Sequence, residues 1–195
     1  MFIRGNFRSH ISALVIGLLL IAIGSNYITD ARKHGGVLTS VTPPGYYGLL
    51  TEALTAGQVN LRIIPDPEFL RLADPYAGPQ GTNRPHDMTF YRGKFYLYYG
   101  ITPALILMVP WRLITGTYLT EVAASASFCL AGFLIAAQWL LRTHRRYFAN
   151  VHISWVMLCL AVLGLGSPIY FLGNNPTFYA VPIAGAFFCL MLAGL

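Results

Sequence analysis

The fold is decided by an apolar run, ISALVIGLLLIAIGSNYI, which extends from Ile11 to Ile28. A helix of this length crosses a hydrocarbon core of about 30 Å if it tilts a little or if its flanking residues snorkel. Similar apolar stretches follow at Leu119 to Leu141, Ile153 to Leu172 and Phe178 to Leu195. The sequence therefore predicts an all-α integral membrane protein with about four transmembrane helices.

The composition agrees with a membrane location. The 195 residues are 55% hydrophobic and 10% charged, with a mean hydropathy of +0.56, whereas a soluble domain carries about 25% charged residues. A net charge of +6 would suit a nucleic-acid partner, but the basic residues are scattered or lie at the ends of spans instead of forming one stripe. We therefore expect membrane lipid, and no nucleic acid, as a partner.

The first apolar run has two interpretations. Arg4 and Arg8 precede it, and the small residues Gly24 and Ser25 lie near its end, as in a cleavable signal peptide. The spans that follow favour an uncleaved anchor instead. Basic residues before the first span place the N-terminus in the cytoplasm. Residues 29–118 then form a long extracytoplasmic loop.

The apolar segment Ile101 to Thr115 contains Pro103, Pro110 and Arg112. If it crossed the membrane, the basic cluster from Arg142 to Arg146 would lie outside, against the positive-inside rule. We therefore expect a juxtamembrane helix at the outer surface, either interfacial or re-entrant. Three parts follow from this topology: residues 1–28 with the first span, the extracytoplasmic loop 29–118, and residues 119–195 with three more spans. Since no polar residue follows the last apolar segment, we expect the natural protein to continue beyond it.

Within the loop, local patterns predict short elements. Pro43-Pro44 precedes an amphipathic helix over Gly45 to Gln58, with Tyr46, Leu49, Leu50, Ala53 and Leu54 on one apolar face. A turn-rich run follows. Thr89 to Tyr91 and Lys94 to Tyr98 then read as two short strands around a tight turn at Arg92-Gly93.

Familiar catalytic motifs are absent from the sequence. Cys129, Cys159 and Cys189 lie far apart in predicted spans, without the spacing of a metal or redox site. The chain has no P-loop, dinucleotide-binding glycine motif, HExxH or GxSxG. Nucleotide-driven transport and zinc proteolysis therefore have no support. Ion transport is also not favoured, because no intramembrane acid marks an ion path within the predicted spans.

Three segments carry a resemblance to a known family: Tyr46 to Gly57, the pair Gly93-Lys94-Phe95-Tyr96 and Thr102-Pro103-Ala104-Leu105, and Leu140 to Phe148. In this order they resemble the opening loop helix, the approach to the juxtamembrane helix and the basic end of the second span in GT-C glycosyltransferases. Members include protein mannosyltransferases and aminoarabinose transferases. The resemblance implies inverting, hexosyltransferase-type transfer from a polyprenyl-phosphate sugar to an extracytoplasmic acceptor, in the inner (plasma) membrane of a bacterium.

The chain departs from this family at one important position. The family's essential acid lies just before the opening helix, where this chain has Thr42-Pro43-Pro44-Gly45. Either another carboxylate serves, or the protein is a non-catalytic membrane protein, such as a truncated remnant or a lipid-binding or assembly partner. Both hypotheses remain open at this stage.

A base is needed if the protein transfers a sugar, and the departing lipid phosphate needs cationic stabilisation. Asp87 is the first candidate for the catalytic carboxylate, with Asp74 and Glu52 as second choices. The candidates for binding substrate or lipid phosphate are His86, Arg84, Arg92 and Lys94. The structural alternatives are an Asx turn at Asp87, a turn at Asp74-Pro75 and a solvated helix face at Glu52.

Two further expectations concern Glu121 and metals. Glu121 begins a predicted span, where a negative charge suits the N-terminus of its own helix. No set of metal-ligating residues is predicted, and the use of a divalent metal by a transferase remains an open possibility.

Overall fold

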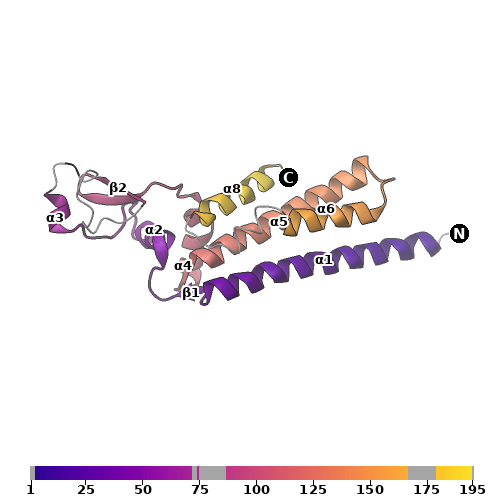
Figure 1. The fold of residues 1–195 in the computed structure, drawn as a ribbon, viewed down its shortest axis with the longest axis horizontal. Coiled ribbons are helices and arrows are strands. Elements are labelled where there is room, and N and C mark those ends of the chain that lie inside the picture. Colours follow the sequence, from indigo (N-terminus) through magenta and orange to yellow (C-terminus); the bar gives the residue numbers. More distant parts are fainter. Residues whose placement is uncertain (1–2, 72–73, 75–86, 167–178, 195) are drawn as a thin grey trace. The chain divides into compact units, whose positions relative to one another are not determined.

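The computed structural model describes residues 3–71, 74, 87–166 and 179–194, and the described chain is mostly helical (Figure 1). It divides into two compact units. The helical unit comprises Met1–Leu38 and Val122–Leu195, and the loop unit comprises Thr39–Glu121. The loop between the first and second apolar helices is therefore a structured body of its own.

Apolar helices make up most of the described part of the helical unit. They are α1 (Ile3–Gly35), α5 (Glu121–Tyr147), α6 (Ile153–Leu165) and α8 (Ala180–Ala193). Among the described residues, α1 and α5 are long and apolar enough to cross a membrane, over Ser12–Lys33 and Glu121–Tyr147. The helices α6 and α8 are shorter, and residues 167–178, on which the predicted third and fourth spans partly fall, lie outside the described residues.

Contacts between helices fix the directions of α1 and α5. Tyr27, late in α1, donates its hydroxyl hydrogen to the carbonyl of Gly164 at 2.8 Å, and its ring lies 6.1 Å from that of Phe133 in α5. Ile16, earlier in α1, packs instead on the buried cluster that contains Ala137, further along α5. The two helices are therefore antiparallel. The N-terminal end of α1 lies at the end of the unit where α5 carries its basic residues.

Large apolar side chains on these helices face away from the protein. Side chains that are at least 45% exposed include those of Leu14, Leu18, Ile21, Leu134, Leu158, Val162, Ile183 and Leu190. They come from α1, α5, α6 and α8. The exposure of so much apolar surface to water is unfavourable. Such patches are typical of surfaces that contact a membrane or another protein.

Close packing at Gly164 makes it a sensitive position. A Cβ atom there would lie 2.7 Å from Cγ2 of Ile23 and 2.9 Å from the ring of Phe133. We expect Gly164→Val to lower the free energy of unfolding by about 1–3 kcal/mol, because the surrounding side chains must move. The control is Gly17→Val, since a Cβ on Gly17 meets no described atom within 4 Å. Denaturation of both variants in detergent micelles measures the difference, and equal stabilities would contradict the packing.

The loop unit combines short helices with two small antiparallel sheets. Its elements are β1 (Thr39–Ser40), α2 (Gly45–Thr55), α3 (Pro67–Leu70), β2 (Met88–Tyr91), β3 (Lys94–Leu97), η1 (Ala104–Met108), α4 (Val109–Thr115) and β4 (Tyr118–Leu119). β2 pairs with β3 as a hairpin, and β1 pairs with β4. The predicted loop helix, hairpin and helix before Thr115 are confirmed.

Pro110 explains the change of helix type between η1 and α4. Proline has no backbone N–H and its ring clashes with the preceding turn, so a regular α-helical ladder cannot run through it. Ala104–Met108 takes the wider π-helical form, and α4 resumes with proline in its first turn. Gly116, with φ of 73°, then ends α4 in the left-handed conformation.

One predicted boundary and one predicted face were wrong. The second long apolar helix does not begin at Leu119, because Tyr118 and Leu119 pair with β1 and α5 begins at Glu121. The helix α5 itself extends past Leu141, the predicted end of the span, through the basic cluster to Tyr147, since arginine is a good helix former. On α2, Tyr47 and Thr51 are buried instead of Tyr46 and Leu54, and the Thr51 hydroxyl is satisfied by the carbonyl of Tyr47 at 2.7 Å.

Candidate functional site

A carboxylate from the far end of the loop unit holds the start of α2. Pro44 precedes this helix in an extended conformation, and no side chain of the helix's own N-cap residue accepts from its first N–H groups. Oε1 of Glu121 instead accepts the backbone N–H of Tyr47 at 2.9 Å. A carboxylate in this position satisfies a donor that the helix leaves unpaired and lies at the positive end of the helix dipole. Glu121 thus begins its own helix, as predicted, and also caps α2.

Gly45 makes room for this carboxylate. Its φ is +60°, and a Cβ atom there would lie 2.6 Å from Cδ of Glu121. Any other residue would be strained in its backbone and would collide with the capping group. The sequence Pro43-Pro44-Gly45 therefore prepares a binding place for Glu121 at the start of the helix.

Asp87 lies among tyrosines at the open end of the β2–β3 hairpin. Tyr98 donates a hydrogen bond to Oδ1 of Asp87 at 3.1 Å, and the hydroxyl groups of Tyr98 and Tyr99 are 2.6 Å apart. The hydroxyl of Tyr47 donates to the carbonyl of Gly100 at 3.1 Å, which joins the buried start of α2 to the segment after the hairpin. Asp87 itself has a φ of 57°, a left-handed conformation that aspartate tolerates better than most residues.

Electrostatics link these side chains into one group. The hydrogen bond from Tyr99, burial and the contact with Asp87 together raise the pKa of Tyr98 to about 12. Burial, then the charges of Asp87 and Glu121, raise the pKa of Tyr46. Burial, then Glu121 and Tyr99, raise the pKa of Tyr47 well above its usual value. All of these tyrosines therefore stay protonated and act as hydrogen-bond donors at neutral pH.

We call this group the tyrosine–carboxylate cluster. Its members are Tyr46, Tyr47, Asp87, Tyr98, Tyr99 and Glu121. The start of α2, the open end of the hairpin and the start of α5 bring it together. It offers the partly exposed carboxylate of Asp87, which can accept a proton, and phenolic hydroxyls that can bind oxygen atoms of a ligand.

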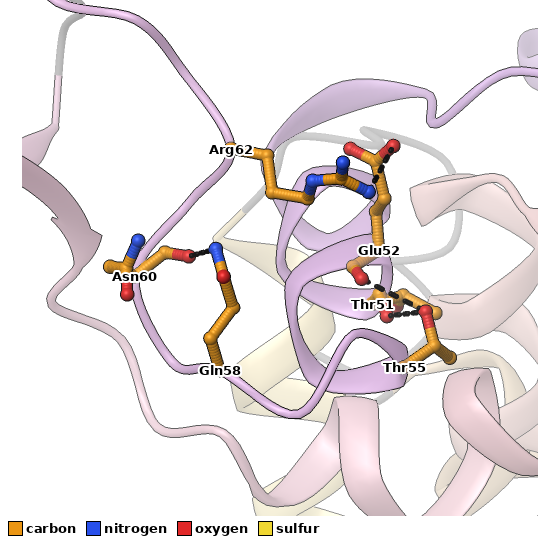
Figure 2. A network of polar contacts seen from close by, with 6 residues as sticks. All are labelled: Thr51, Glu52, Thr55, Gln58, Asn60 and Arg62. Carbon is orange, nitrogen blue, oxygen red and sulfur yellow. Dashed lines mark hydrogen bonds and ion pairs between the residues drawn. The ribbon is translucent and has the colours of Figure 1, made fainter.

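Glu52 lies in a different network, which Figure 2 shows. Its Oε1 is 3.8 Å from Nη1 of Arg62, and both side chains are partly exposed. On the same helix, Thr55 donates to the carbonyls of Thr51 and Glu52 at 3.0 and 2.9 Å. An ion pair of this kind contributes roughly 0.2–1 kcal/mol. Glu52 is thus a residue on the surface of a helix, as in the alternative to a catalytic role given for it above.

The other candidates from the sequence do not gather around Asp87. Arg92 and Lys94 are exposed at the tip of the hairpin, with the Arg92 guanidinium 5.1 Å from the centre of the Tyr91 ring. Asp87 is at the opposite end, about 13 Å away along a four-residue strand. Asp74 is exposed. Arg84 and His86 lie outside the described residues.

The raised pKa of Tyr98 predicts a pH dependence. Because the folded protein holds this proton more tightly than the unfolded chain, the associated stability is fully present below pH 10 and is lost as pH rises toward about 12. We expect spectrophotometric titration to show a tyrosine ionising near pH 12 that disappears in Tyr98→Phe. The control is Tyr91→Phe, which removes an equally exposed tyrosine of the same hairpin and should keep that ionisation. Loss of the ionisation near pH 12 in both variants would contradict its assignment to Tyr98.

Sequence reasoning missed most of the cluster. None of the tyrosines was predicted as a site residue, and Glu121 was expected to act on its own helix. Tyr47 and Glu121 are 74 residues apart, so no local spacing reveals their contact. The one usable signal was Gly45 after two prolines, which marks a helix start without a capping side chain.

Comparison with known proteins gives no family. No family model matches the chain, and neither the curated proteins nor the solved structures contain a significant match. Among the residues that the structure describes, no three His, Cys, Asp or Glu side chains form a group that could hold a metal ion.

Proposed function

We propose that the chain is an integral membrane protein with four transmembrane helices and a cytoplasmic N-terminus, located in the plasma membrane of a bacterium. The lengths of α1 and α5, and the exposed apolar side chains of the helical unit, support insertion into lipid. The antiparallel packing of α1 and α5 supports the orientation, because it brings the start of α1, with Arg4 and Arg8, to the same end as the basic last turn of α5. The loop unit then faces the extracytoplasmic side.

In this position, the loop unit serves as the catalytic part of a glycosyltransferase that uses a polyprenyl-phosphate sugar. The observation that carries the proposal is the setting of Asp87, a partly exposed carboxylate hydrogen-bonded by Tyr98 at the edge of the tyrosine–carboxylate cluster. Tyrosine hydroxyls suit the many oxygen atoms of a sugar. A carboxylate beside them suits the activation of an acceptor hydroxyl.

The reaction is an inverting displacement. An acceptor hydroxyl attacks the anomeric carbon of the donor and forms a new glycosidic C–O bond, while the bond from the anomeric carbon to the phosphate oxygen breaks. Asp87 takes the proton of the acceptor hydroxyl, and polyprenyl phosphate departs with the bonding electron pair. The protonated hydroxyl of Tyr46 donates a hydrogen bond to a sugar or phosphate oxygen, while Tyr99 donates to Tyr98 and Tyr98 donates to Asp87.

Glu121 has a positioning role in this proposal. Its carboxylate is already engaged, because Oε1 accepts the backbone N–H of Tyr47 at 2.9 Å and so holds the start of α2. It occupies the start of the loop helix, next to the position where the resembled family has its essential acid. By holding α2, Glu121 fixes Tyr46 and Tyr47 relative to Asp87.

The second hypothesis, a non-catalytic lipid-binding or assembly protein, draws on the same contacts. Both carboxylates of the cluster have hydrogen-bond donors, so a purely structural role would satisfy them as well. Thr42-Pro43-Pro44-Gly45 also lacks the acid that the resembled family has in its own sequence at this place. Turnover of a donor separates the two hypotheses.

Release of polyprenyl phosphate tests the proposal with an unidentified acceptor, provided that an extract of the cell envelope supplies the acceptor to the reaction. Membranes that contain the full natural chain are incubated with labelled polyprenyl-phosphate mannose or polyprenyl-phosphate aminoarabinose, and the free lipid phosphate is measured. The proposal predicts release with at least one donor above the level of membranes without the protein. No release from any donor of this class, with the protein folded and abundant, would favour the non-catalytic alternative.

A further inference from the structure

A basic pocket lies at the end of α5, away from the tyrosine–carboxylate cluster in the sequence. It is an open pocket of about 250 Å³, lined by Trp139, Arg142, Thr143, Arg146, Tyr147 and Gly194. The end of α8 borders one side, since a Cβ on Gly194 would collide with the Trp139 ring. Two helices of the helical unit thus form a small surface pocket with two exposed cations and two aromatic rings.

The cations of this pocket have no protein counterion in the described chain. Arg142 and Arg146 form no ion pair with the described carboxylates; the ion pairs found there are Lys33 with Asp30 and Arg62 with Glu52. The Arg146 guanidinium lies 5.4 Å from the centre of the Tyr147 ring. Two guanidinium groups without a counterion among the described residues favour an anion, and guanidinium matches a phosphate with paired hydrogen bonds.

The position of the pocket along α5 identifies the source of the anion. From Glu121, about 20 residues at 1.5 Å each cross a hydrocarbon core of about 30 Å, and this count ends near Leu141. Arg142 is therefore the first residue past the core, at the depth of lipid phosphates. Trp139 and Tyr147, with rings that favour the interface, lie on either side of it.

We propose that this pocket binds the phosphate of an anionic phospholipid in the membrane leaflet at the C-terminal end of α5. Arg142 and Arg146 contact the phosphate, and Trp139 packs beside the upper part of the acyl chains. Leu190 and Leu192 on α8, a few residues before Gly194 in the sequence, are also exposed and apolar. The site is separate from the proposed transfer reaction, since it lies at the opposite end of α5 from Glu121.

Lipid binding to the purified full chain tests this proposal. Native mass spectrometry in detergent compares phosphatidylglycerol with phosphatidylcholine for the wild type, Arg142→Gln, Arg146→Gln and Arg145→Gln. Arg145 is the matched control, because it carries the same charge in the same helical turn but does not line the pocket. We expect Arg142→Gln and Arg146→Gln each to weaken phosphatidylglycerol binding about five- to tenfold, and Arg145→Gln less than about twofold.

The outcomes decide between a site and its alternatives. Equal losses in all three variants would show diffuse surface charge and overturn the proposal. Displacement of phosphatidylglycerol by millimolar inorganic phosphate would overturn its assignment to lipid and make the pocket a site for free phosphate. Thermal unfolding of each variant shows that the fold is retained, and Arg142→Lys, which keeps the charge, should recover part of the binding.

Discussion

Asp87→Asn is expected to lower the release of polyprenyl phosphate by a factor of about 10²–10⁴, the usual effect of losing a general base. An amide has nearly the shape of the carboxylate and can still accept the hydrogen bond from Tyr98. In the unmodified chain the Tyr98 hydroxyl lies 3.1 Å from Oδ1 of Asp87. It cannot take the proton of the acceptor. The loss should therefore appear in turnover, with the abundance of the protein in the membrane unchanged.

The matched control for this variant is Glu52→Gln. It makes the same kind of change on the other partly exposed carboxylate that the sequence nominated, whose partner is Arg62 instead of the tyrosines. We expect it to retain activity within about twofold, because it breaks only an exposed ion pair. Full activity in Asp87→Asn, or an equal loss in both variants, would remove Asp87 from the role of base.

Gly45→Ala is expected to destabilise the loop unit by about 2–3 kcal/mol. The left-handed backbone costs an alanine about 1–2 kcal/mol, and the loss of a helix cap costs about 1 kcal/mol more. The second term applies because the new Cβ would lie 2.6 Å from the Glu121 carboxyl carbon, so that the carboxylate must leave the start of α2. Hydrogen exchange of the α2 backbone amides measures the effect in the full chain.

Gly57→Ala isolates the contribution of Glu121. Gly57 also has a positive φ, +75°, but a Cβ there meets no described atom within 4 Å. Gly57→Ala should therefore lower the free energy of unfolding only by the cost of the left-handed backbone. Combining Gly45→Ala with Glu121→Ala should cost less than the sum of the two single changes, since both remove the same contact. Equal effects of the two glycine substitutions would contradict the capping contact.

Elements with a local signal could be predicted from the sequence. Pro43-Pro44 before an apolar helical pattern gave α2, and Arg92-Gly93 between residues that favour strands gave the hairpin. The positive φ values of Arg92 and Gly93 show why the turn formed at that place. Asp87 was chosen for its neighbours in sequence, yet its described partner is Tyr98, across the open end of the hairpin.

Contacts between distant segments could not be predicted. Thr39 pairs with Leu119, and Glu121 caps a helix that begins 76 positions earlier in the numbering, at Gly45. Neither contact produces a periodic pattern that can be recognised in a single sequence. The apolar character of Leu119 therefore suggested a span, and the position of Glu121 suggested its own helix alone.

Labelling of engineered cysteines in intact cells tests most directly whether the loop unit lies outside the membrane, on which the proposed transfer reaction depends. Val59→Cys reports on the exposed surface of the loop unit, and Asn150→Cys on the exposed turn after α5, in a background where Cys129, Cys159 and Cys189 are replaced by alanine. A maleimide that cannot cross the membrane should modify Val59→Cys in intact cells, and Asn150→Cys only after the cells are permeabilised. Labelling of Asn150→Cys but not of Val59→Cys in intact cells would reverse the topology and contradict an extracytoplasmic catalytic site.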